Sequence, residues 1–394
     1  MSLKSGIKII EILENNGYEA FFVGGAVRDY LLKREIKDID ITTNCLPDKV
    51  LELFKGVETG KKYGCVTVFQ DEFSFEVTTY RLDGKYMDSR HPEEIRFTSD
   101  VKEDTARRDF TINALLMDKN FKIYDFIGGL EDLKNKTLRA VGNQHERFKE
   151  DSIRLLRAVY FALKLGFNVE EKTFFAIKED ANLINQIAAE RVILELKKIF
   201  EYGNITDIIL LLRKTTLHEF IPNLKKGADV LAQSTNLESM DFHEFMALIF
   251  YLDHEEYQDY WRFSNKEFAN FNSIFNLVAV TETDNFNNLL VYTYGKKLCL
   301  IANKINRILY QAKNQSELIE KIDSNLPIRK TCELKFKGGE LISLYNLKGV
   351  QYIGSIVDDI KFQVINHKLK NNFEEIKMFV ENKYLGGVIF DKKN

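Results

Sequence analysis

The sequence predicts an α+β protein in which a small domain with a mixed sheet is followed by a long all-helical region. Up to about residue 136, short runs rich in β-branched and aromatic residues alternate with amphipathic helical patterns. After residue 140, nearly every segment has the apolar spacing of a helix. Only four prolines occur in the 394 residues, so little interrupts these helices.

The strands and helices of the first domain are predicted from their composition. Four segments have the pattern of strands, namely YEAFFVG (18–24), DIDIT (38–42), CVTVFQ (65–70) and FSFEVTTY (73–80). Two segments between them have the pattern of helices, AVRDYLLKR (26–34) and PDKVLELFK (47–55). We expect the whole chain to divide into four parts, at residues 1–138, 139–200, 201–310 and 311–394.

Composition excludes several classes of protein. The sequence has no apolar run of about 18 residues, so no membrane span is expected. The four cysteines are far apart in the sequence, with no CxxC and no histidine at the spacing of metal ligands. Neither a zinc site nor a disulfide framework is therefore expected, and scattered thiols suit a reducing cytoplasm.

A Gly-Gly pair stands between the first predicted strand and the first predicted helix. At Gly24 and Gly25 the backbone can approach a ligand closely, and the helix that follows offers free N–H groups and a positive dipole end. Arg28 lies close behind and can clamp a phosphate with two hydrogen bonds. The sequence has no GxxxxGK[ST], so this is not a P-loop. A plain turn is the alternative interpretation.

Two aspartates alternate with two isoleucines in the next predicted strand. Asp38 and Asp40 then share one face, about 6.6 Å apart, while Ile39 and Ile41 point into the core. Two carboxylates on one face favour Mg²⁺, which prefers oxygen ligands. Solvated acids at a strand end are the alternative. Glu76 interrupts another apolar strand and is a candidate third carboxylate, with a cross-strand salt bridge as its alternative.

A helix is predicted through EDSIRLLRAVYF (150–161). At 100° per residue, one arc of about 120° holds Glu150, Asp151, Arg154 and Arg157. A salt-bridged surface face is the simplest interpretation of this arc, with Glu150 and Arg154 four residues apart.

Five motifs in order give the chain a family resemblance: GGAVRDYLLKR…DIDITT, EVTTYR, RRDFTINAL (107–115), YDFIGGLEDL (124–133) and EDSIRLLRAVYFALKLGF (150–167). The chain resembles the bacterial class II CCA-adding enzymes, tRNA nucleotidyltransferases that share a catalytic head with bacterial poly(A) polymerases. The resemblance is strong over about residues 20–200 and continues more weakly to the C-terminus.

The resemblance implies a fold and a reaction. It implies a nucleotidyltransferase head of the polymerase β type followed by a helical neck, body and tail, which bind a tRNA that lacks all or part of its 3′ CCA. The 3′ hydroxyl of the tRNA would attack the α-phosphate of CTP or ATP in the presence of Mg²⁺, and pyrophosphate would leave. Asp38 and Asp40 would be the metal ligands, with Glu76 a third catalytic carboxylate.

The resemblance also implies which residues hold the nucleotide. Gly24, Gly25 and Arg28 would hold the triphosphate. Arg108 would contact the nucleotide, and Asp109 and Asn113 would lie near the sugar. For Arg107 and Arg108, a salt bridge to a helix is the structural alternative.

The neck residues offer a way to select the base. A carboxylate only accepts hydrogen bonds and a guanidinium only donates them, so Asp151 and Arg154 match the amine and ring nitrogen of cytosine or adenine. Uracil and guanine present the reverse order and would be refused. Glu150 would hold Arg154, and Arg157 would contact the nucleotide. The sequence departs from the family at Tyr160, where an arginine often stands.

The remaining choice is among members of the family. ETGKKYGCVTVF (58–69) resembles the CCA-type pattern, and RLDGKYMDSRHPEEIRF (81–97) has the length of the flexible loop that CC-adding enzymes tend to lack. Full CCA addition is favoured over A-only addition or a poly(A) polymerase, and a catalytically inactive RNA-binding module is a hypothesis of another class. No His-Asp dipeptide occurs, so no HD phosphohydrolase domain is expected.

Charge along the chain points to the end that would contact RNA. The net charge is −3, but residues 301–394 contain 16 Lys and Arg against 11 Asp and Glu. This excess is a weak indication of a polyanion partner. The candidate phosphate contacts in this tail are Lys330, Lys335, Lys337, Lys368 and Lys370.

Overall fold

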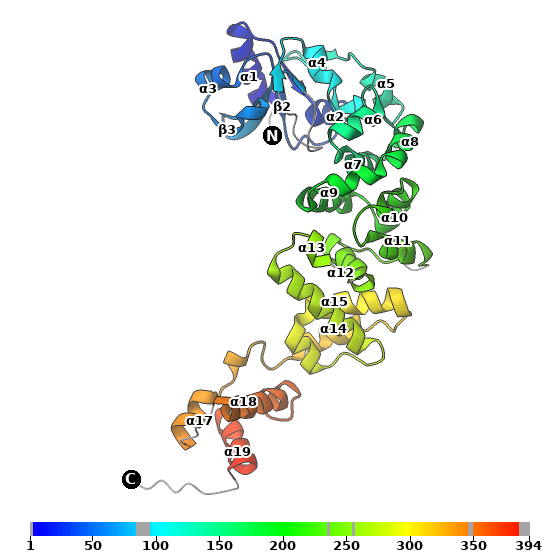
Figure 1. The fold of residues 1–394 in the computed structure, drawn as a ribbon. Helices are drawn as coiled ribbons and strands as arrows, with labels where there is room; N and C mark the ends of the chain where they lie inside the picture. The colour runs from blue at the N-terminus through cyan, green and yellow to red at the C-terminus, as the bar shows by residue number, and fades with distance from the viewer. Residues whose placement is uncertain (1–2, 84–94, 235–236, 254–256, 346–349, 386–394) are drawn as a thin grey trace. The chain divides into compact units, whose positions relative to one another are not determined.

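The computed structural model describes residues 3–83, 95–234, 237–253, 257–345 and 350–385. Figure 1 follows the chain from the N-terminal sheet in blue to the C-terminal helices in red. The chain forms two compact units, the first made of Met1–Phe245 with Leu252–Arg262 and the second of Met246–Tyr251 with Phe263–Asn394. This boundary falls inside the predicted segment 201–310. The finer division into four parts stays a prediction.

The first unit is built on a mixed sheet, as the sequence predicts. The described residues place seven strands in the order β3-β4-β5-β2-β1-β8-β9. All neighbours run antiparallel except β2 and β5, which run parallel. The strands are β1 (Ala20–Val23), β2 (Asp40–Thr43), β3 (Gly56–Gly60), β4 (Cys65–Gln70), β5 (Phe73–Thr79), β8 (Leu116–Met117) and β9 (Ile123–Tyr124). The four predicted strands are therefore confirmed as β1, β2, β4 and β5.

Two further pairs of strands are short. They are β6 (Arg81–Asp83) with β7 (Ile95–Phe97), and β10 (Thr137–Leu138) with β11 (Asn168–Val169). The loop expected within 81–97 lies between β6 and β7, and its central part, 84–94, is outside the described residues.

Helix α1 (Leu3–Asn15) packs closely on the sheet. Its Ile9, Ile10 and Leu13 are completely buried. A Cβ at Gly6 would lie only 2.5 Å from Cε1 of Phe22, so glycine is what lets the helix backbone approach strand β1. This contact fixes the sheet from which the loops of the site project.

The other helices of the first unit alternate with the strands along the first part of the chain, and the later part of the unit is mostly helical. They are α2 (Gly25–Leu31), α3 (Pro47–Leu53), α4 (Val101–Ala106), α5 (Gly129–Lys134), α6 (Gln144–Glu150), α7 (Arg154–Leu165), α8 (Glu171–Glu179), α9 (Ala189–Tyr202), α10 (Ile205–Lys214), α11 (Leu224–Gln233) and α13 (Tyr257–Tyr260). The two helices predicted at 26–34 and 47–55 are confirmed as α2 and α3.

The continuous helix predicted from residue 150 onward is wrong. Helix α6 ends at Glu150, Asp151 is extended with φ −143° and ψ 99°, and α7 begins at Arg154. The Asp151 carboxylate accepts a hydrogen bond from the N–H of Ile153 at 3.4 Å. Short polar side chains such as Asp and Ser compete with a helix in this way, by bonding to nearby backbone groups. Glu150 and Asp151 therefore do not share a helical arc with Arg154 and Arg157.

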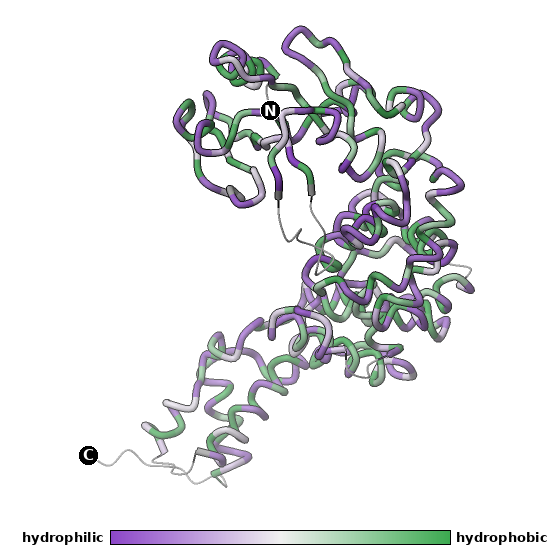
Figure 2. The backbone as a smooth tube through the Cα atoms, turned by 45° about the horizontal axis from the view of Figure 1, so that its top comes forward, coloured by the Kyte–Doolittle hydropathy of each residue, from purple (hydrophilic) through white to green (hydrophobic). Residues whose placement is uncertain are grey.

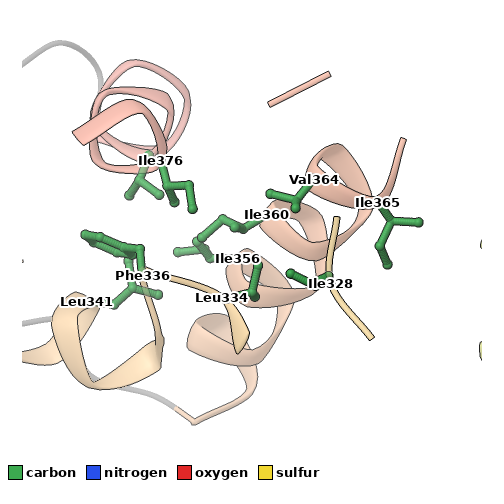
Figure 3. Close-up of a cluster of buried hydrophobic side chains, with 10 residues drawn as sticks. Ile328, Leu334, Phe336, Leu341, Ile356, Ile360, Val364, Ile365 and Ile376 are labelled. Atoms are coloured by element: carbon green, nitrogen blue, oxygen red, sulfur yellow. The ribbon is translucent and has the colours of Figure 1, made fainter. Parts of the chain in front are cut away.

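The second unit is helical. Helix α12 (Phe242–Leu252) contributes residues 246–251, and the others are α14 (Asn265–Thr281), α15 (Asn288–Tyr310), α16 (Ser316–Asn325), α17 (Gly338–Tyr345), α18 (Val350–Ile365) and α19 (Phe373–Tyr384). Its C-terminal part has a compact hydrophobic core, drawn in Figure 3, in which Phe336 and Ile356 lie toward Ile376 of α19. This core fixes the segments that carry the candidate tail lysines.

Apolar and polar segments alternate along the helices in short stretches (Figure 2). Of the helices formed by the described residues, none combines the length and the hydropathy needed to cross a membrane.

Candidate nucleotide-binding site

A cavity of about 680 Å³ lies in the first unit and gathers most of the residues predicted for the site. The predicted residues that line it are Gly24, Gly25, Arg28, Asp38, Asp40, Arg108, Asp109, Asn113 and Arg157. They come from the β1–α2 turn, the start of β2, the segment after α4, and helix α7.

The β1–α2 turn forms one wall of the cavity. Gly24 has φ 72° and ψ −133°, a conformation that side chains disfavour, and Gly25 begins α2. A Cβ on Gly24 would lie 3.5 Å from Oδ2 of Asp40 and 3.7 Å from Nη1 of Arg108. The turn therefore brings backbone directly against a carboxylate and a guanidinium of the site.

The two aspartates precede and begin strand β2. Asp40 is its first residue, whereas Asp38 is exposed and comes before the strand. Ile39 and Ile41 are 1% and 0% exposed, so the predicted alternation of core and site residues is confirmed.

Glu76 lies beside Asp40 but does not line the cavity. The parallel ladder pairs Asp40 with Glu76, so their side chains point to the same face of the sheet. Oε1 of Glu76 accepts a hydrogen bond from the thiol of Cys65 at 2.9 Å. Among the described residues, this carboxylate is therefore bound by a thiol donor and not by the salt bridge considered as an alternative.

The electrostatics of Asp40 favour a bound cation. Burial raises the pKa of Asp40 to about 6, the charges of Glu76 and Asp38 act in the same direction, and Arg108 opposes them. Among the described residues, no group of three or more His, Cys, Asp or Glu side chains is placed to hold a metal ion alone. Mg²⁺ is usually held by one or two carboxylates together with phosphates of the substrate. Asp38 and Asp40 fit a metal that binds with a nucleotide.

Arg28 is held rigidly inside the cavity. It is 2% exposed, donates from Nη1 to Oδ1 of Asn113 at 2.6 Å, and donates from Nε to Oδ1 of Asp29 at 2.8 Å. Its guanidinium lies 5.2 Å from the ring centre of Phe161. In the described part of the chain its one carboxylate partner is Asp29, so this buried guanidinium retains the capacity to bind an anion.

The two arginines after α4 share one buried carboxylate. Nη2 of Arg107 lies 2.6 Å from Oδ1 of Asp104, and Nη2 of Arg108 lies 3.1 Å from its Oδ2. Burial favours the neutral form of Asp104, but the two arginines outweigh it and hold the pKa of the carboxyl below its usual range. The salt-bridge alternative for these arginines is thus present, and Arg108 lines the cavity as well.

Asp109 links this segment to helix α7. Its Oδ2 accepts from Nε and Nη2 of Arg157 at 2.9 and 2.6 Å. Its Oδ1 accepts from Nδ2 of Asn113 at 3.2 Å and from the N–H of Phe110 at 2.7 Å. Burial alone would raise the pKa of Asp109, yet Arg157 and its other partners hold the pKa below its usual range. The Asp109 carboxylate therefore connects the segment around Asn113 to Arg157 of α7.

Glu150, Asp151 and Arg154 lie outside the lining of this cavity. Arg154 donates from Nη1 to Oε2 of Glu150 at 2.8 Å, as expected for this pair, and its two terminal nitrogens also donate to main-chain carbonyls of Arg147 and Arg107. Both oxygens of Asp151 accept from Nη2 of Arg191, at 2.9 and 3.0 Å. Arg154 therefore contacts the segment that carries Arg108 through the Arg107 carbonyl, whereas Asp151 is paired with Arg191, which does not line the cavity.

The structure adds residues that the sequence did not single out. They are Asp29, Arg34, Glu35, Lys37, Phe161, Lys164, Lys198, Glu201 and Tyr202, together with Tyr160, which was noted only as a departure from the family. Lys164 follows Arg157 by seven residues, or two helical turns, so helix periodicity was a usable signal for it. The residues from α9 carry no local motif.

Comparison with known proteins identifies the family. A model of the poly(A) polymerase head domain matches residues 20–139, one of a probable RNA- and SrmB-binding site of polymerase A matches 166–227, and one of a putative second domain of tRNA nucleotidyltransferases matches 243–380. The CCA-adding enzyme of Bacillus cytotoxicus is 33% identical over 95% of this chain and 96% of its own. That of Oceanobacillus iheyensis is 36% identical over 94% and 95%. The chain belongs to the CCA-adding enzymes.

Solved structures of CCA-adding enzymes agree with this assignment. The Bacillus stearothermophilus CCA-adding enzyme in complex with CTP superimposes with a TM-score of 0.83 at 28% identity, covering 98% of this chain and 99% of that one. The Thermotoga maritima CCA-adding enzyme complexed with tRNA shares the fold at a TM-score of 0.65 and 19% identity, over 96% and 95% of the two chains. The predicted family, the α+β fold with a nucleotidyltransferase head, and the enzyme class are confirmed.

Proposed function

We propose that this CCA-adding enzyme builds the 3′ CCA of tRNA from CTP and ATP, and that the cavity described above is where nucleotidyl transfer occurs. The 3′ oxygen of the RNA bonds to the α-phosphorus, the bond from that phosphorus to the oxygen of the β-phosphate breaks, and pyrophosphate leaves. The observation that carries this assignment is that one cavity holds a glycine turn, paired aspartates and several arginines.

Asp38 and Asp40 are the proposed ligands of Mg²⁺. When bound, the metal ion supplies positive charge that stabilises the phosphates and the attacking oxygen. Glu76, beside Asp40 in the sheet, is proposed as a third carboxylate that increases the negative charge of this end of the strands.

The nucleotide phosphates are proposed to bind at the β1–α2 turn. Gly24 and Gly25 let the chain approach them, and Arg28 donates hydrogen bonds from a position that Asn113 and Asp29 restrict. Arg108 adds positive charge beside Gly24. Since these groups are ordered before the substrate arrives, little reorganisation is needed during transfer.

Selection of C and A is proposed to rest on Asp151 and Arg154. Asp151 accepts from the exocyclic amine and Arg154 donates to the ring nitrogen, whereas U and G present the opposite pattern. A carboxylate has about four lone-pair sites, so Asp151 can hold Arg191 and still accept from a base. Glu150 is proposed to position Arg154 through their ion pair. Asp109, Asn113 and Arg157 are proposed to contact the sugar and the rest of the nucleotide.

The RNA partner is proposed to be a tRNA lacking all or part of its CCA, with its phosphates contacted by the tail lysines of the second unit. Because tRNA, CTP and ATP occur together in the cytoplasm, we infer that the enzyme acts there.

A labelling assay tests this function. Radiolabelled ATP, with and without CTP, is offered with Mg²⁺ to tRNA lacking CCA, to tRNA ending in CC and to unstructured RNA. Full CCA addition requires that labelling of the tRNA lacking CCA depend on CTP. Labelling of tRNA ending in CC alone indicates an A-adding enzyme, and long products on unstructured RNA indicate a poly(A) polymerase. No labelling at all indicates an inactive RNA-binding module.

The variant Asp38→Asn sharpens the assay. It should abolish labelling while the protein stays folded, because Asp38 is exposed. Glu72→Gln, an exposed carboxylate at the turn between β4 and β5, is the matched control and should label at the normal rate.

A further inference from the structure

Lys164 lies in the nucleotide cavity in an aromatic cage. Its ammonium is 5.3 Å from the ring centre of Tyr160 and 5.2 Å from that of Tyr202, and it donates a hydrogen bond to the hydroxyl of Tyr160 at 3.0 Å. The two rings meet edge to face with their centres 5.8 Å apart. Three side chains from α7 and α9 thus fix one positive charge at the cavity wall.

The Lys164 ammonium is not paired with an anionic side chain among the described residues. In that part of the chain, no carboxylate lies within ion-pair distance of its ammonium. Lys198, by contrast, lines the same cavity and is paired with Glu195 at 3.0 Å. Arg28, the guanidinium proposed for the phosphates, already shares Asp29. The cavity lining formed by the described residues has seven Lys and Arg side chains against six Asp and Glu, so its surplus is one positive charge, which a bound anion would compensate.

The ionisation of Lys164 agrees with this surplus. Burial lowers the pKa of its ammonium, and the charge of Arg28 lowers it further, with Asp29 acting in the opposite direction. A lysine in this situation is stabilised when an anion enters the cavity, because the anion offsets both effects.

Helix geometry places Lys164 one turn beyond Tyr160, on the same face of α7. The ammonium of Lys164 therefore lies over the ring of Tyr160 and reaches its hydroxyl from the next turn.

We propose that Lys164 binds a phosphate oxygen of the incoming nucleoside triphosphate, and that Tyr160 and Tyr202 are positioning residues that hold its ammonium in the cavity. The proposal rests on the function proposed above for this cavity. A phosphate of the RNA backbone has the same chemistry, and the experiment separates these two sources.

Binding of inorganic triphosphate to the full chain, measured by calorimetry with Mg²⁺, is the first test. Lys164→Met removes the charge but keeps the aliphatic stem, and we expect affinity to fall about tenfold, since a hydrogen bond from a charged group is removed. Lys164→Arg should restore most of it. The matched control is Lys197→Met, because Lys197 also lies over a ring, that of Phe242 at 5.5 Å, but does not line the cavity. The affinity of Lys197→Met for inorganic triphosphate should equal that of the wild type.

The positioning role has its own readout. Tyr160→Phe keeps the ring and removes the hydroxyl that accepts from Lys164, so KM for CTP and ATP should rise about threefold with kcat unchanged. A fall in kcat as large as the rise in KM, or no change in either constant, would contradict a positioning role.

Binding of tRNA lacking CCA distinguishes the sources of phosphate. Lys164→Met should bind this tRNA as the wild type does. If tRNA affinity falls while triphosphate affinity is unchanged, the proposal is overturned, because the lysine then serves the RNA backbone. If the wild type fails to add nucleotides to tRNA, yet Lys164→Met still loses triphosphate affinity, the proposed function fails and this inference stands.

Discussion

Asp40 lies directly opposite Glu76 in the parallel ladder between β2 and β5. The two carboxylates share one face of the sheet, and Asp38 adds a third charge close by. Burial, Glu76 and Asp38 together raise the pKa of Asp40 to about 6 against its ordinary value of 3.8, and the charge of Arg108 acts in the opposite direction. The fold therefore concentrates negative charge here and is strained by it when no cation is bound.

Removing one of these charges should stabilise the protein. Because the folded state binds the Asp40 proton more tightly than the unfolded state, the contribution of Asp40 to the free energy of unfolding is highest below about pH 4 and falls as pH rises to about 6. Asp40→Asn should therefore raise stability by about 2 kcal/mol at pH 7 in EDTA, seen as a rise of several degrees in Tm, with little effect at pH 4. Nucleotidyl transfer should be lost.

The control for this variant is Asp259→Asn, an exposed aspartate of α13, which should change Tm little at either pH. Added Mg²⁺ and CTP should stabilise the wild type and not Asp40→Asn. A lower Tm for Asp40→Asn than for the wild type at pH 7 would show that the electrostatic account of this site is wrong.

The pair of Asp109 and Arg157 should be the most sensitive ionic contact of the site. It is partly buried, doubly hydrogen-bonded, and joins the segment before η2 (Thr111–Asn113) to α7. Arg157→Ala removes the ion-pair partner of a partly buried carboxylate that keeps its hydrogen bonds from Asn113 and Phe110, so we expect a loss of about 1.5–3 kcal/mol in stability and weaker nucleotide binding. Arg213→Ala breaks an exposed pair with Asp229 and should cost less than about 1 kcal/mol. Urea unfolding measures the loss of stability in both variants. Equal losses would show that the Asp109–Arg157 pair is no more sensitive than an exposed ion pair.

Base choice should depend on Asp151 and on the arginine that holds it. The double variant Asp151→Ala with Arg154→Ala should relax the choice among CTP, ATP and UTP in single-nucleotide incorporation, while metal binding is retained. Arg191→Ala leaves the Asp151 carboxylate in place but unheld, so discrimination should fall only in part. If the double variant discriminates as the wild type does, neither residue reads the base.

Sequence patterns predicted the sheet and the cavity wall that it carries, because those features depend on the order of neighbouring residues along the chain. Alternation placed Ile39 and Ile41 in the core and Asp40 outside it, and a glycine pair after a strand marked the turn. The break between α6 and α7 was not predicted, since Glu150 and Arg154 have the spacing of a helical ion pair and that pair forms across the break. It depends on how the Asp151 side chain bonds to the backbone of Ile153.

Residues contributed by distant helices were also not predicted. Tyr202 reaches the cavity from α9, about forty residues beyond Tyr160, and only the packing of α9 on α7 brings the two rings together. Glu76 could be paired with the aspartates as a hypothesis, but its register opposite Asp40 is a property of the sheet.

The tail lysines should affect RNA binding through charge alone. All five candidates are exposed, and Lys335 and Lys337 lie around the buried Phe336 of the C-terminal core. Replacing both with alanine should weaken tRNA binding and reduce the salt slope by about one for each phosphate that the variant no longer neutralises. Lys383→Ala is the control, because Lys383 is held by Asp359 at 2.7 Å. A slope that stays at the wild-type value would assign these lysines to plain surface.

Gly24 should be required for activity as well as for folding. Its φ of 72° with ψ of −133° is costly for any side chain, so Gly24→Ala should lose about 1–3 kcal/mol of stability. Gly17→Ala is matched to it, since Gly17 has φ 86° and a Cβ there would meet nothing within 4 Å. Both variants should therefore have a lower Tm.

Only Gly24→Ala should also lose catalysis, because a shift of its turn moves the backbone that lies against Asp40 and Arg108. We expect kcat/KM to fall by at least tenfold for Gly24→Ala and to stay within about twofold of the wild type for Gly17→Ala, at a temperature where both are folded. If the two variants lose stability equally and retain the same kcat/KM, the turn serves the fold alone and the phosphates bind elsewhere in the cavity.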